Sequence, residues 1–347
     1  MLPESLLATD PPLPMLVTGY TGVSGFNAFA YFRQRYPGRV ITLRQRSNWP
    51  LVGDGIVACD AEDRDELARL FARYQFRSVL NCAGNCALKS CELDPAMAWR
   101  LNLRGLQNLL ETIGTADVRL VHASIDLVFS GDGLGGYDER AWTDPVTVYG
   151  KSMAAAESLV LLARPDACVM RISLPMGPSH SQHAGAIDWI QWRFANGKPA
   201  TLYFDEIRTP TYADCLNRVF HYGLTHPLAG IFHAGGPRRL SLYQIAQIVN
   251  RVGGYDPDLL IGCDRIEAGP MPPRAGNVSM DSRKLADAIG QPPFDAWPLE
   301  DRWMPADRDW HRDRTTEPAG SPQLLARILY QNPRAMAALG VGHPGHG

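Results

Sequence analysis

The sequence predicts an α/β fold, in which a doubly wound parallel sheet precedes a smaller C-terminal substrate-binding subdomain. Two observations predict it. Short apolar runs alternate with helical stretches, which implies right-handed crossovers and a parallel sheet covered on both faces. The first run, Met15–Val17, continues through Gly19, Gly22 and Gly25 into an apolar pattern of helical period. A strand that turns through spaced glycines into a helix is typical of a Rossmann-type dinucleotide-binding domain.

We divide the chain into four parts on this basis. Residues 1–14 contain four prolines and no periodicity, so we expect an extended N-terminal arm. Residues 15–174 form the Rossmann domain. Residues 175–300 form the smaller α/β subdomain, from which the chain can cross back to the Rossmann domain, and residues 301–347 form a C-terminal extension.

The predicted strands and helices follow from local composition. Apolar, β-branched runs predict strands at residues 15–17, 40–43, 56–58, 78–83 and 119–123. Amphipathic periodicity predicts helices at residues 63–74, 96–113, 187–195, 241–253, 281–289 and 323–330. Ligands of a doubly wound sheet bind at the carboxyl ends of its strands, so residues that follow a strand are the candidates for binding.

The turn after the first strand is the first candidate binding site. Gly19 lets the chain turn, Gly22 lets the backbone approach a pyrophosphate, and Gly25 lets the helix pack against the strand. The helix N-terminus then offers unpaired N–H groups and a partial positive charge. The predicted cofactor-binding residues of this turn also include Tyr20, Thr21 and Val23.

Residues after the next strands bear on which cofactor binds. Arg44 and Arg46 follow the second strand, where an NAD site usually has an acidic residue, and arginines there suit the 2′-phosphate of NADP(H). The alternative is a solvated loop in an arginine-rich chain. Asp60, after the third strand, is placed to reach the adenine amino group. Ala83 and Gly84 are small enough for the backbone to pass close to a cofactor.

Composition argues against several classes of function. The 347 residues carry a formal net charge of −2, which gives no sign of nucleic-acid or membrane-surface binding. No apolar run reaches the ~18 residues of a membrane span. Seven cysteines without a paired framework fit reduced thiols, so we expect a cytoplasmic protein. Cys82, Cys86 and Cys91 lack the close CxxC spacing of common zinc and iron–sulfur sites, so we expect no metal.

Several ordered motifs make the sequence recognisable. They are the glycine turn, residues 81–84, Asn102, Asp126 with Val128 and Phe129, Tyr149 with Gly150, Arg171, and the segments beginning at Arg208, Gly230 and Pro272. Across residues 15–290 the chain resembles the extended short-chain dehydrogenase/reductase family, and within it the dTDP-4-dehydrorhamnose reductase branch. That branch also contains the regulatory β subunit of methionine adenosyltransferase. The resemblance implies an oxidoreductase for a nucleotide sugar or related carbonyl compound, with Asn102 and Tyr149 at the cofactor.

The chemistry of this family needs three side chains. A serine or threonine polarises the substrate carbonyl, a tyrosine passes a proton, and a lysine four residues after the tyrosine lowers its pKa and binds the nicotinamide ribose. Here the tyrosine is Tyr149, but Ile125 stands at the hydroxyl position and Met153 at the lysine position. Tyr149 is therefore the one matching catalytic residue, and the predicted active site is degenerate.

Neighbouring side chains are poor replacements. Lys151 lies two residues after Tyr149, about 200° away around the helix. Ser124 can supply the hydroxyl only if the strand ends before it, because side chains alternate along a strand. Weaker candidates are Lys89 and two histidines of the segment expected to roof the substrate cleft, His180 and His183.

The second half holds the expected substrate-binding residues, Trp189, Arg193 and Arg208, which would stack a base and pair with a diphosphate. The alternative is an ordinary core with surface arginines.

Three functions compete: an NADPH-dependent reductase with Tyr149 alone as acid, a cofactor-binding regulatory or scaffold subunit, and an enzyme of different chemistry. The sequence slightly favours the reductase. It leaves open whether the chain forms a homodimer or binds a different partner.

Overall fold

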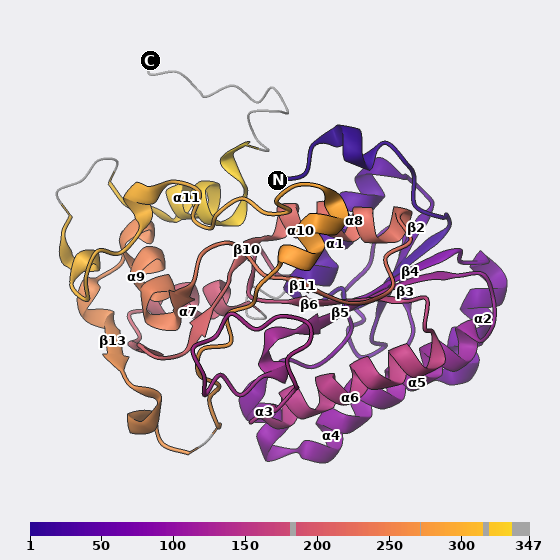
Figure 1. The fold of residues 1–347 in the computed structure, drawn as a ribbon, viewed down its shortest axis with the longest axis horizontal. Coiled ribbons are helices and arrows are strands. Elements are labelled where there is room, and N and C mark those ends of the chain that lie inside the picture. The colour runs from indigo at the N-terminus through magenta and orange to yellow at the C-terminus, as the bar shows by residue number, and fades with distance from the viewer. Residues whose placement is uncertain (181–184, 271, 315–318, 335–347) are drawn as a thin grey trace.

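A seven-stranded parallel sheet lies at the centre of the protein (Figure 1). The computed structural model describes residues 1–180, 185–270, 272–314 and 319–334. The strand order is β11-β6-β5-β4-β1-β2-β3, and every neighbouring pair is parallel. The strands are β1 (Met15–Val17), β2 (Val40–Arg44), β3 (Ile56–Ala58), β4 (Ser78–Asn81), β5 (Arg119–Ile125), β6 (Cys168–Ile172) and β11 (Gly230–Ala234). This order confirms the predicted doubly wound α/β fold.

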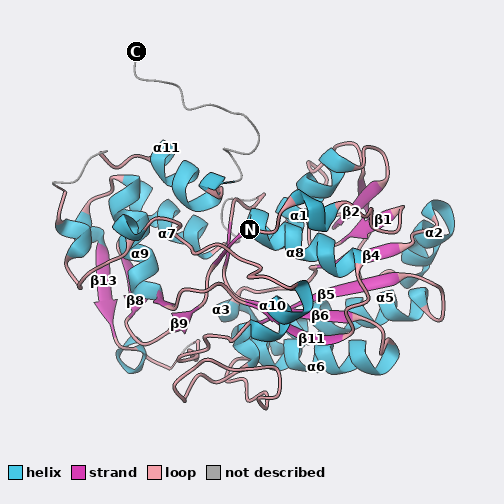
Figure 2. Cartoon of the chain, turned by 45° about the horizontal axis from the view of Figure 1, so that its top comes forward, coloured by secondary structure: helices cyan, strands magenta, loops and turns pink. Residues whose placement is uncertain are grey.

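Helices cover both faces of the sheet (Figure 2). One face packs against α1 (Val23–Arg35) and α8 (Ala213–Thr225), and the other against α2 (Arg64–Tyr74), α5 (Gly105–Ile113) and α6 (Val148–Ala163). The alternation is visible within β1, because Met15 and Val17 enter the first core cluster and Leu16 enters the second. Both clusters are fully apolar in character, as a buried parallel sheet requires.

The helix predicted at residues 96–113 is continuous but not uniform. It begins with α4 (Pro95–Trp99), passes through a π-helical turn at Arg100–Arg104, and continues as α5. Before it lies α3 (Leu88–Leu93). Single π turns inside α-helices occur frequently at functional sites, and this one contains Asn102.

The second half of the chain builds a smaller unit beside the carboxyl ends of the strands (Figure 2). Its strands form three two-stranded pairs, β7 with β10, β8 with β13 and β9 with β12. Its elements are β7 (Pro175–Met176), α7 (Ala186–Ala195), β8 (Ala200–Tyr203), β9 (Ile207–Arg208), β10 (Thr211–Tyr212), β12 (Leu240–Ser241), α9 (Leu242–Gly253), β13 (Leu260–Cys263) and α11 (Pro322–Leu325).

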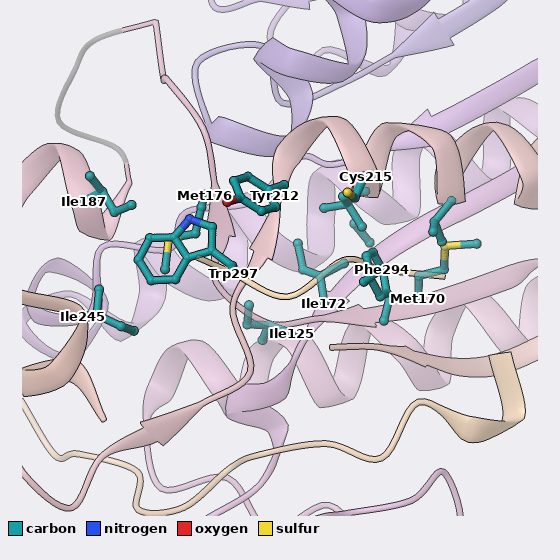
Figure 3. Close-up of a cluster of buried hydrophobic side chains, with 14 of the residues drawn as sticks. Ile125, Met170, Ile172, Met176, Ile187, Tyr212, Cys215, Ile245, Phe294 and Trp297 are labelled. Atoms are coloured by element: carbon teal, nitrogen blue, oxygen red, sulfur yellow. The ribbon is translucent and has the colours of Figure 1, made fainter. Parts of the chain in front are cut away.

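The chain crosses between the two units more than once. After β10 it returns to the Rossmann sheet through α8 and β11, and again through α10 (Arg283–Ile289), which packs against β11. Figure 3 shows Met176, Tyr212 and Trp297 gathered where the units meet, and all three are almost fully buried. Within the described ranges, no helix has the length and apolarity to cross a membrane.

The N-terminal arm is not the extended segment predicted for residues 1–14. Glu4–Leu7 forms a 3-10 turn, and Leu2 and Leu7 are buried in the core cluster that contains α8. Arg218 of α8 donates to the Leu2 carbonyl at 2.9 Å. The prolines restrict the arm without preventing it from packing, because the leucines between them supply apolar surface to bury.

A buried ion pair fastens α6 to the sheet. Glu157 of α6 accepts from Arg171 Nε at 2.8 Å and Nη2 at 2.7 Å, and both side chains are almost fully buried. Ser124 of β5 donates to the same carboxylate at 2.5 Å, and Arg171 Nη1 lies 3.2 Å from His233 Nε2 on β11. One helix is thus joined to three adjacent strands through a single carboxylate and guanidinium.

Glu157→Gln should destabilise the protein strongly. It keeps the side-chain size but leaves Arg171 as an uncompensated buried charge, so the free energy of unfolding should fall by about 3–5 kcal/mol in denaturant titrations. The control is Glu111→Gln, which breaks an ion pair with Arg64 whose side chains are 37% and 63% exposed, respectively. That variant should lose less than about 1 kcal/mol. Similar losses in the two variants would contradict the role given to the buried pair.

Candidate functional site

The glycine turn between β1 and α1 has the geometry of a close backbone approach. Gly19 has φ +75°, and a Cβ there would lie 2.2 Å from a backbone carbonyl oxygen after β4. A Cβ on Gly25 would lie 2.2 Å from the Gly19 oxygen, so only glycine lets α1 pack this closely. A Cβ on Gly22 would make one ordinary contact, at 3.6 Å, among the described residues. Thr21 is exposed, and Val23 is buried at the start of α1.

Thr18 ties this turn to the neighbouring strands. Its hydroxyl donates to Asn81 Oδ1 at 2.5 Å and accepts from the N–H groups of Cys82 and Ala83 at 3.1 and 3.2 Å. Asn81 Nδ2 lies 2.9 Å from His122 Nδ1, and burial lowers the pKa of His122 to about 4, so the neutral ring accepts this bond. The carboxyl ends of β1, β4 and β5 are therefore held together. Thr18 was not among the residues predicted from the sequence.

Tyr20 connects the glycine turn to a distant segment. Its ring centroid lies 5.6 Å from Phe26 and 5.4 Å from Phe29, both on α1. His180, which follows β7, stacks on Tyr20 at 5.7 Å. The segment expected to roof the substrate cleft therefore contacts the glycine turn. His183 lies outside the described residues.

The two arginines predicted to select the cofactor have different surroundings. The Arg46 guanidinium lies 2.8 Å from Asp63 Oδ2 and 3.7 Å from Asp60 Oδ2, with a third carboxylate at 4.0 Å. Asp60 Oδ1 also accepts from the Arg46 backbone N–H at 2.9 Å. Arg44 donates to the backbone carbonyls of the next two residues and, among the described residues, pairs with no carboxylate. Arg44 thus has the guanidinium that is available to a phosphate.

The expected catalytic residues lie on β5 and on α6, which packs against it. Ile125 is the last residue of β5, and Tyr149 and Met153 lie one turn apart on α6. All three are buried in one apolar cluster, and Figure 3 shows Ile125 among its members. Lys151 is exposed, on the opposite side of α6. Ile125 and Met153, which we predicted to stand at the hydroxyl and lysine positions of the family, are thus both apolar and buried, and their assignment to those positions stays a prediction.

Tyr149 is the proton-bearing side chain in this group. Burial raises the pKa of its hydroxyl well above the ordinary value, and Cys86 and Asp126 raise it further. Arg208 acts in the opposite direction, but its charge is already paired with Asp126. Tyr149 therefore stays protonated at neutral pH, so that it can donate a proton but is a poor base.

Arg208 is paired with Asp126, so its guanidinium already has a partner, and its predicted contact with a substrate diphosphate stays a prediction. Its Nε donates to Asp126 Oδ2 at 2.7 Å, its Nη2 donates to Oδ1, and only 4% of the residue is exposed. Ser173 donates to the same carboxylate at 2.5 Å, and Glu206 Oε1 lies 3.8 Å from Arg208 Nη1. The pair joins β9 to the segment after β5. The sequence did not reveal this partnership, because 82 residues separate Arg208 from Asp126.

Asn102 is also hydrogen-bonded within the protein, and its predicted contact with the cofactor stays a prediction. Its Oδ1 accepts from the Asn85 N–H at 2.7 Å, and its Nδ2 donates to Ser152 Oγ at 2.8 Å. Ser152 Oγ in turn donates to the Tyr149 carbonyl at 2.7 Å. Asn102 is buried, so it positions α6 and the loop of Ala83 and Gly84 from behind. Asn102 reaches both α6 and this loop from the π-helical turn at Arg100–Arg104.

Ser124 is not a replacement for the missing hydroxyl. The strand continues to Ile125, beyond its predicted end at residue 123, so Ser124 points to the opposite face and donates to Glu157. Lys89 is exposed on α3 and does not join the buried group. The structure therefore brings no substitute hydroxyl or ammonium from these candidates to Tyr149.

Trp189 and Arg193 lie together on α7. Trp189 is 41% exposed, and the Arg193 guanidinium lies 5.3 Å from its ring centroid. Arg193 Nε also donates to the Pro199 carbonyl at 2.5 Å. An exposed indole beside a guanidinium suits stacking on a base or sugar, so their predicted contact with substrate stays a prediction.

The cysteines of the loop after β4 are free thiols. Burial raises the pKa of Cys82 to about 12, and burial with nearby charges raises that of Cys91 to about 11. These thiols are therefore protonated at neutral pH, which disfavours metal ligation. No group of three or more His, Cys, Asp or Glu side chains suited to a metal occurs in the described ranges.

The sheet order, the glycine turn before α1 and the tyrosine on α6 define an extended short-chain dehydrogenase/reductase fold. Residues 14–298 match the RmlD substrate binding domain, and the chain belongs to that family. This confirms the resemblance predicted from the sequence motifs. The family match ends at residue 298, so it does not include the C-terminal extension.

Three comparisons illustrate the relationship. The dTDP-4-dehydrorhamnose reductase of Mycolicibacterium smegmatis is 30% identical over 246 residues, covering 69% of this chain and 72% of the relative. Methionine adenosyltransferase 2 subunit beta of Danio rerio is 23% identical over 284 residues, covering 78% and 83%. The structure of dTDP-4-dehydrorhamnose reductase from Bacillus anthracis in complex with NADP superimposes with a TM-score of 0.68 at 18% identity, covering 82% and 95%.

Gly22→Val should abolish dinucleotide binding in a folded protein. The added side chain enters the space beside the N-terminus of α1 without a backbone clash in the described structure. Circular dichroism should show a native fold, while NADPH titration followed by cofactor fluorescence should show no saturable binding. Gly25→Ala is the contrasting variant, because its methyl group would collide with backbone and destabilise the turn itself. Unchanged NADPH affinity in folded Gly22→Val would mean that the turn is only structural.

Proposed function

We propose that the protein binds a nicotinamide cofactor and a nucleotide sugar, or a related carbonyl compound, and reduces the carbonyl with Tyr149 as its only proton donor. The observation that carries this proposal is the place of Tyr149, which lies one turn before Met153 on α6 and close enough to Asp126, the residue after Ile125 at the end of β5, for that carboxylate to act on its pKa. The names of the reductase relatives and the NADP complex of a structural neighbour support the substrate and cofactor classes. In this proposal the active site has one proton donor, Tyr149, and apolar side chains at the other two catalytic positions.

The glycine turn fits the pyrophosphate of such a cofactor. Gly22, the N-cap of α1, leaves open space around its Cα, and the first N–H groups of the helix are available at the same end of α1. A bound reduced nicotinamide supplies the hydride. Tyr149 supplies the proton from its hydroxyl, while Ile125 and Met153 give the carbonyl oxygen no further hydrogen bond and the tyrosine no neighbouring ammonium.

This arrangement favours reduction over oxidation and makes it slow. A tyrosine with a raised pKa donates a proton to a developing alkoxide but does not readily remove one from an alcohol. Losing a positioned acid–base group typically costs about 10²- to 10⁴-fold in rate. We therefore expect a weak reductase.

A cofactor-binding subunit without redox turnover is the second candidate. The buried Ile125 and Met153 favour it, because they fill the catalytic positions with apolar groups. A relative named as a methionine adenosyltransferase subunit beta shows that a similar chain is described as a subunit. A cleft rebuilt for another reaction is the remaining alternative.

Restoring both catalytic groups tests these candidates. The wild type should reduce a dTDP-4-keto-6-deoxy sugar near the background rate, followed as NADPH oxidation. Ile125→Thr with Met153→Lys should raise that rate by about 10²-fold or more, since each restored group contributes to proton transfer or carbonyl polarisation. Thermal unfolding and sugar titration accompany the assay, because both replaced residues are buried.

The two possible failures have different meanings. Ordinary enzymatic turnover by the wild type would refute the assignment of Ile125 and Met153 to the catalytic positions. A folded double variant that binds the sugar and NADPH but stays inert would instead favour a cleft with another chemistry. Tyr149→Phe is the control in both cases, and it should abolish any turnover that depends on this proton donor.

We further propose that NADPH binds more tightly than NADH, and that Arg44 rather than Arg46 makes the difference. Arg46 is held by carboxylates, whereas Arg44 is available to a 2′-phosphate. Arg44→Ala should weaken NADPH binding by about 10-fold, the effect of a charge-assisted hydrogen bond, and leave NADH binding unchanged. Arg46→Ala is the matched control and should affect both cofactors alike. Equal affinities of the wild type for NADPH and NADH would contradict this preference.

A further inference from the structure

The C-terminal extension runs along both units although it lies outside the family match. We call the last described part of this extension, residues 319–334, the strap. Leu325 and Leu329 are fully buried, and Trp297 Nε1 donates to the Leu329 carbonyl at 2.9 Å. At its far end the Asn332 N–H donates to Asp214 Oδ2 of α8 at 2.9 Å. The strap is therefore an integral part of the fold.

Tyr330 of the strap reaches α7. Its hydroxyl lies 2.5 Å from Gln191 Oε1 and 3.2 Å from Asp188 Oδ1, and with one proton it donates to one of these oxygens at a time. Burial and the Asp188 charge raise the pKa of Tyr330, which keeps the hydroxyl a donor at neutral pH. Asp188 is itself buried.

Asp188 carries this contact to the segment after β7. Its other oxygen, Oδ2, accepts from the Ser179 N–H at 3.2 Å and from the Ser179 hydroxyl at 2.5 Å. On one side of Ser179, the Pro178 carbonyl accepts from a side chain of α1 at 2.8 Å. On the other, His180 stacks on Tyr20 of the glycine turn. The buried carboxylate of Asp188 thus connects the strap to residues 178–180, which contact the glycine turn.

We propose that Tyr330 is a positioning residue for the cofactor site. Through Asp188 and Ser179 it holds residues 178–180 against the glycine turn and fixes the ring of Tyr20 beside the place of the pyrophosphate. This inference rests on the proposed binding of a nicotinamide cofactor at that turn. Because Asp188 shares its two oxygens between the strap and Ser179, loss of the Tyr330 hydroxyl frees the carboxylate to shift and loosens both contacts.

Tyr330→Phe tests the proposal, because it removes only the hydroxyl. The Kd for NADPH, and separately for NADH, should rise about threefold to tenfold, the range that one lost hydrogen bond produces. The matched control is Tyr222→Phe, whose buried hydroxyl donates to the Ala288 carbonyl at 3.1 Å and has no contact with the strap. It should leave both Kd values unchanged. Thermal unfolding of both variants distinguishes a local effect from general destabilisation.

A double-mutant cycle tests the route of the effect. Ser179→Ala should weaken cofactor binding to a similar extent, because it removes the 2.5 Å hydroxyl bond to the other oxygen of Asp188 and leaves the weaker bond from the backbone N–H at 3.2 Å. The double variant with Tyr330→Phe should then be little worse than either single variant. Additive losses would show that the two residues act separately, and would overturn the route through Asp188.

The outcomes separate this inference from the function on which it rests. Folded Tyr330→Phe that binds both cofactors like the wild type overturns the positioning role and leaves the proposed function intact. A wild type that binds neither NADPH nor NADH overturns the proposed function, and this inference with it. Equal weakening in Tyr222→Phe would show a general loss of stability and would also overturn the positioning role.

Discussion

The buried ion pair between Glu157 and Arg171 is the contact on which the site depends most. It fixes α6 against β5 and β6, and α6 carries both Tyr149 and Met153. Two charges removed from water are tolerated only when they are paired and hydrogen-bonded, and Ser124 and His233 complete the set. In this geometry Ser124 donates to the buried ion pair, and Ile125, the next residue of β5, points to the opposite face of the sheet. The same contact thus engages the hydroxyl of Ser124, the residue next to Ile125.

The site combines a well-formed frame with altered chemistry. The glycine turn, the Thr18 contacts and the strand ends are built as a dinucleotide site requires, with backbone approaching backbone within limits that a side chain would violate. In the proposed function the proton-transfer positions differ, because Ile125 and Met153, assigned to them from the sequence, are both apolar and buried. Replacing both polar groups avoids leaving either one unpaired in a dry environment. The result fits binding better than fast turnover.

The part of the chain beyond the family match adds contacts that its relatives need not share. The strap packs with Trp297 and Tyr212 where the two units meet, and it reaches the glycine turn through one buried carboxylate. These contacts restrict the position of the smaller unit relative to the carboxyl ends of the strands of the central sheet. In our proposal, cofactor binding is linked to the strap by the same buried polar groups.

The sequence by itself predicted five of the seven strands of the sheet and the glycine turn, because these depend on local periodicity and glycine spacing, and an ungapped motif led to the assignment of Ile125, Tyr149 and Met153. It did not predict β6 and β11 as strands. It did not determine the partners of long-range polar groups. Arg208 was assigned to substrate and Asn102 to cofactor, and their partners within the protein are Asp126 for Arg208 and Asn85 and Ser152 for Asn102. The packing of the N-terminal arm was missed because local periodicity does not show that Leu2 and Leu7 reach a distant part of the core. Only the tertiary structure decides which distant charges and amides meet, since a buried polar group must find its partner wherever the fold brings one within hydrogen-bonding distance.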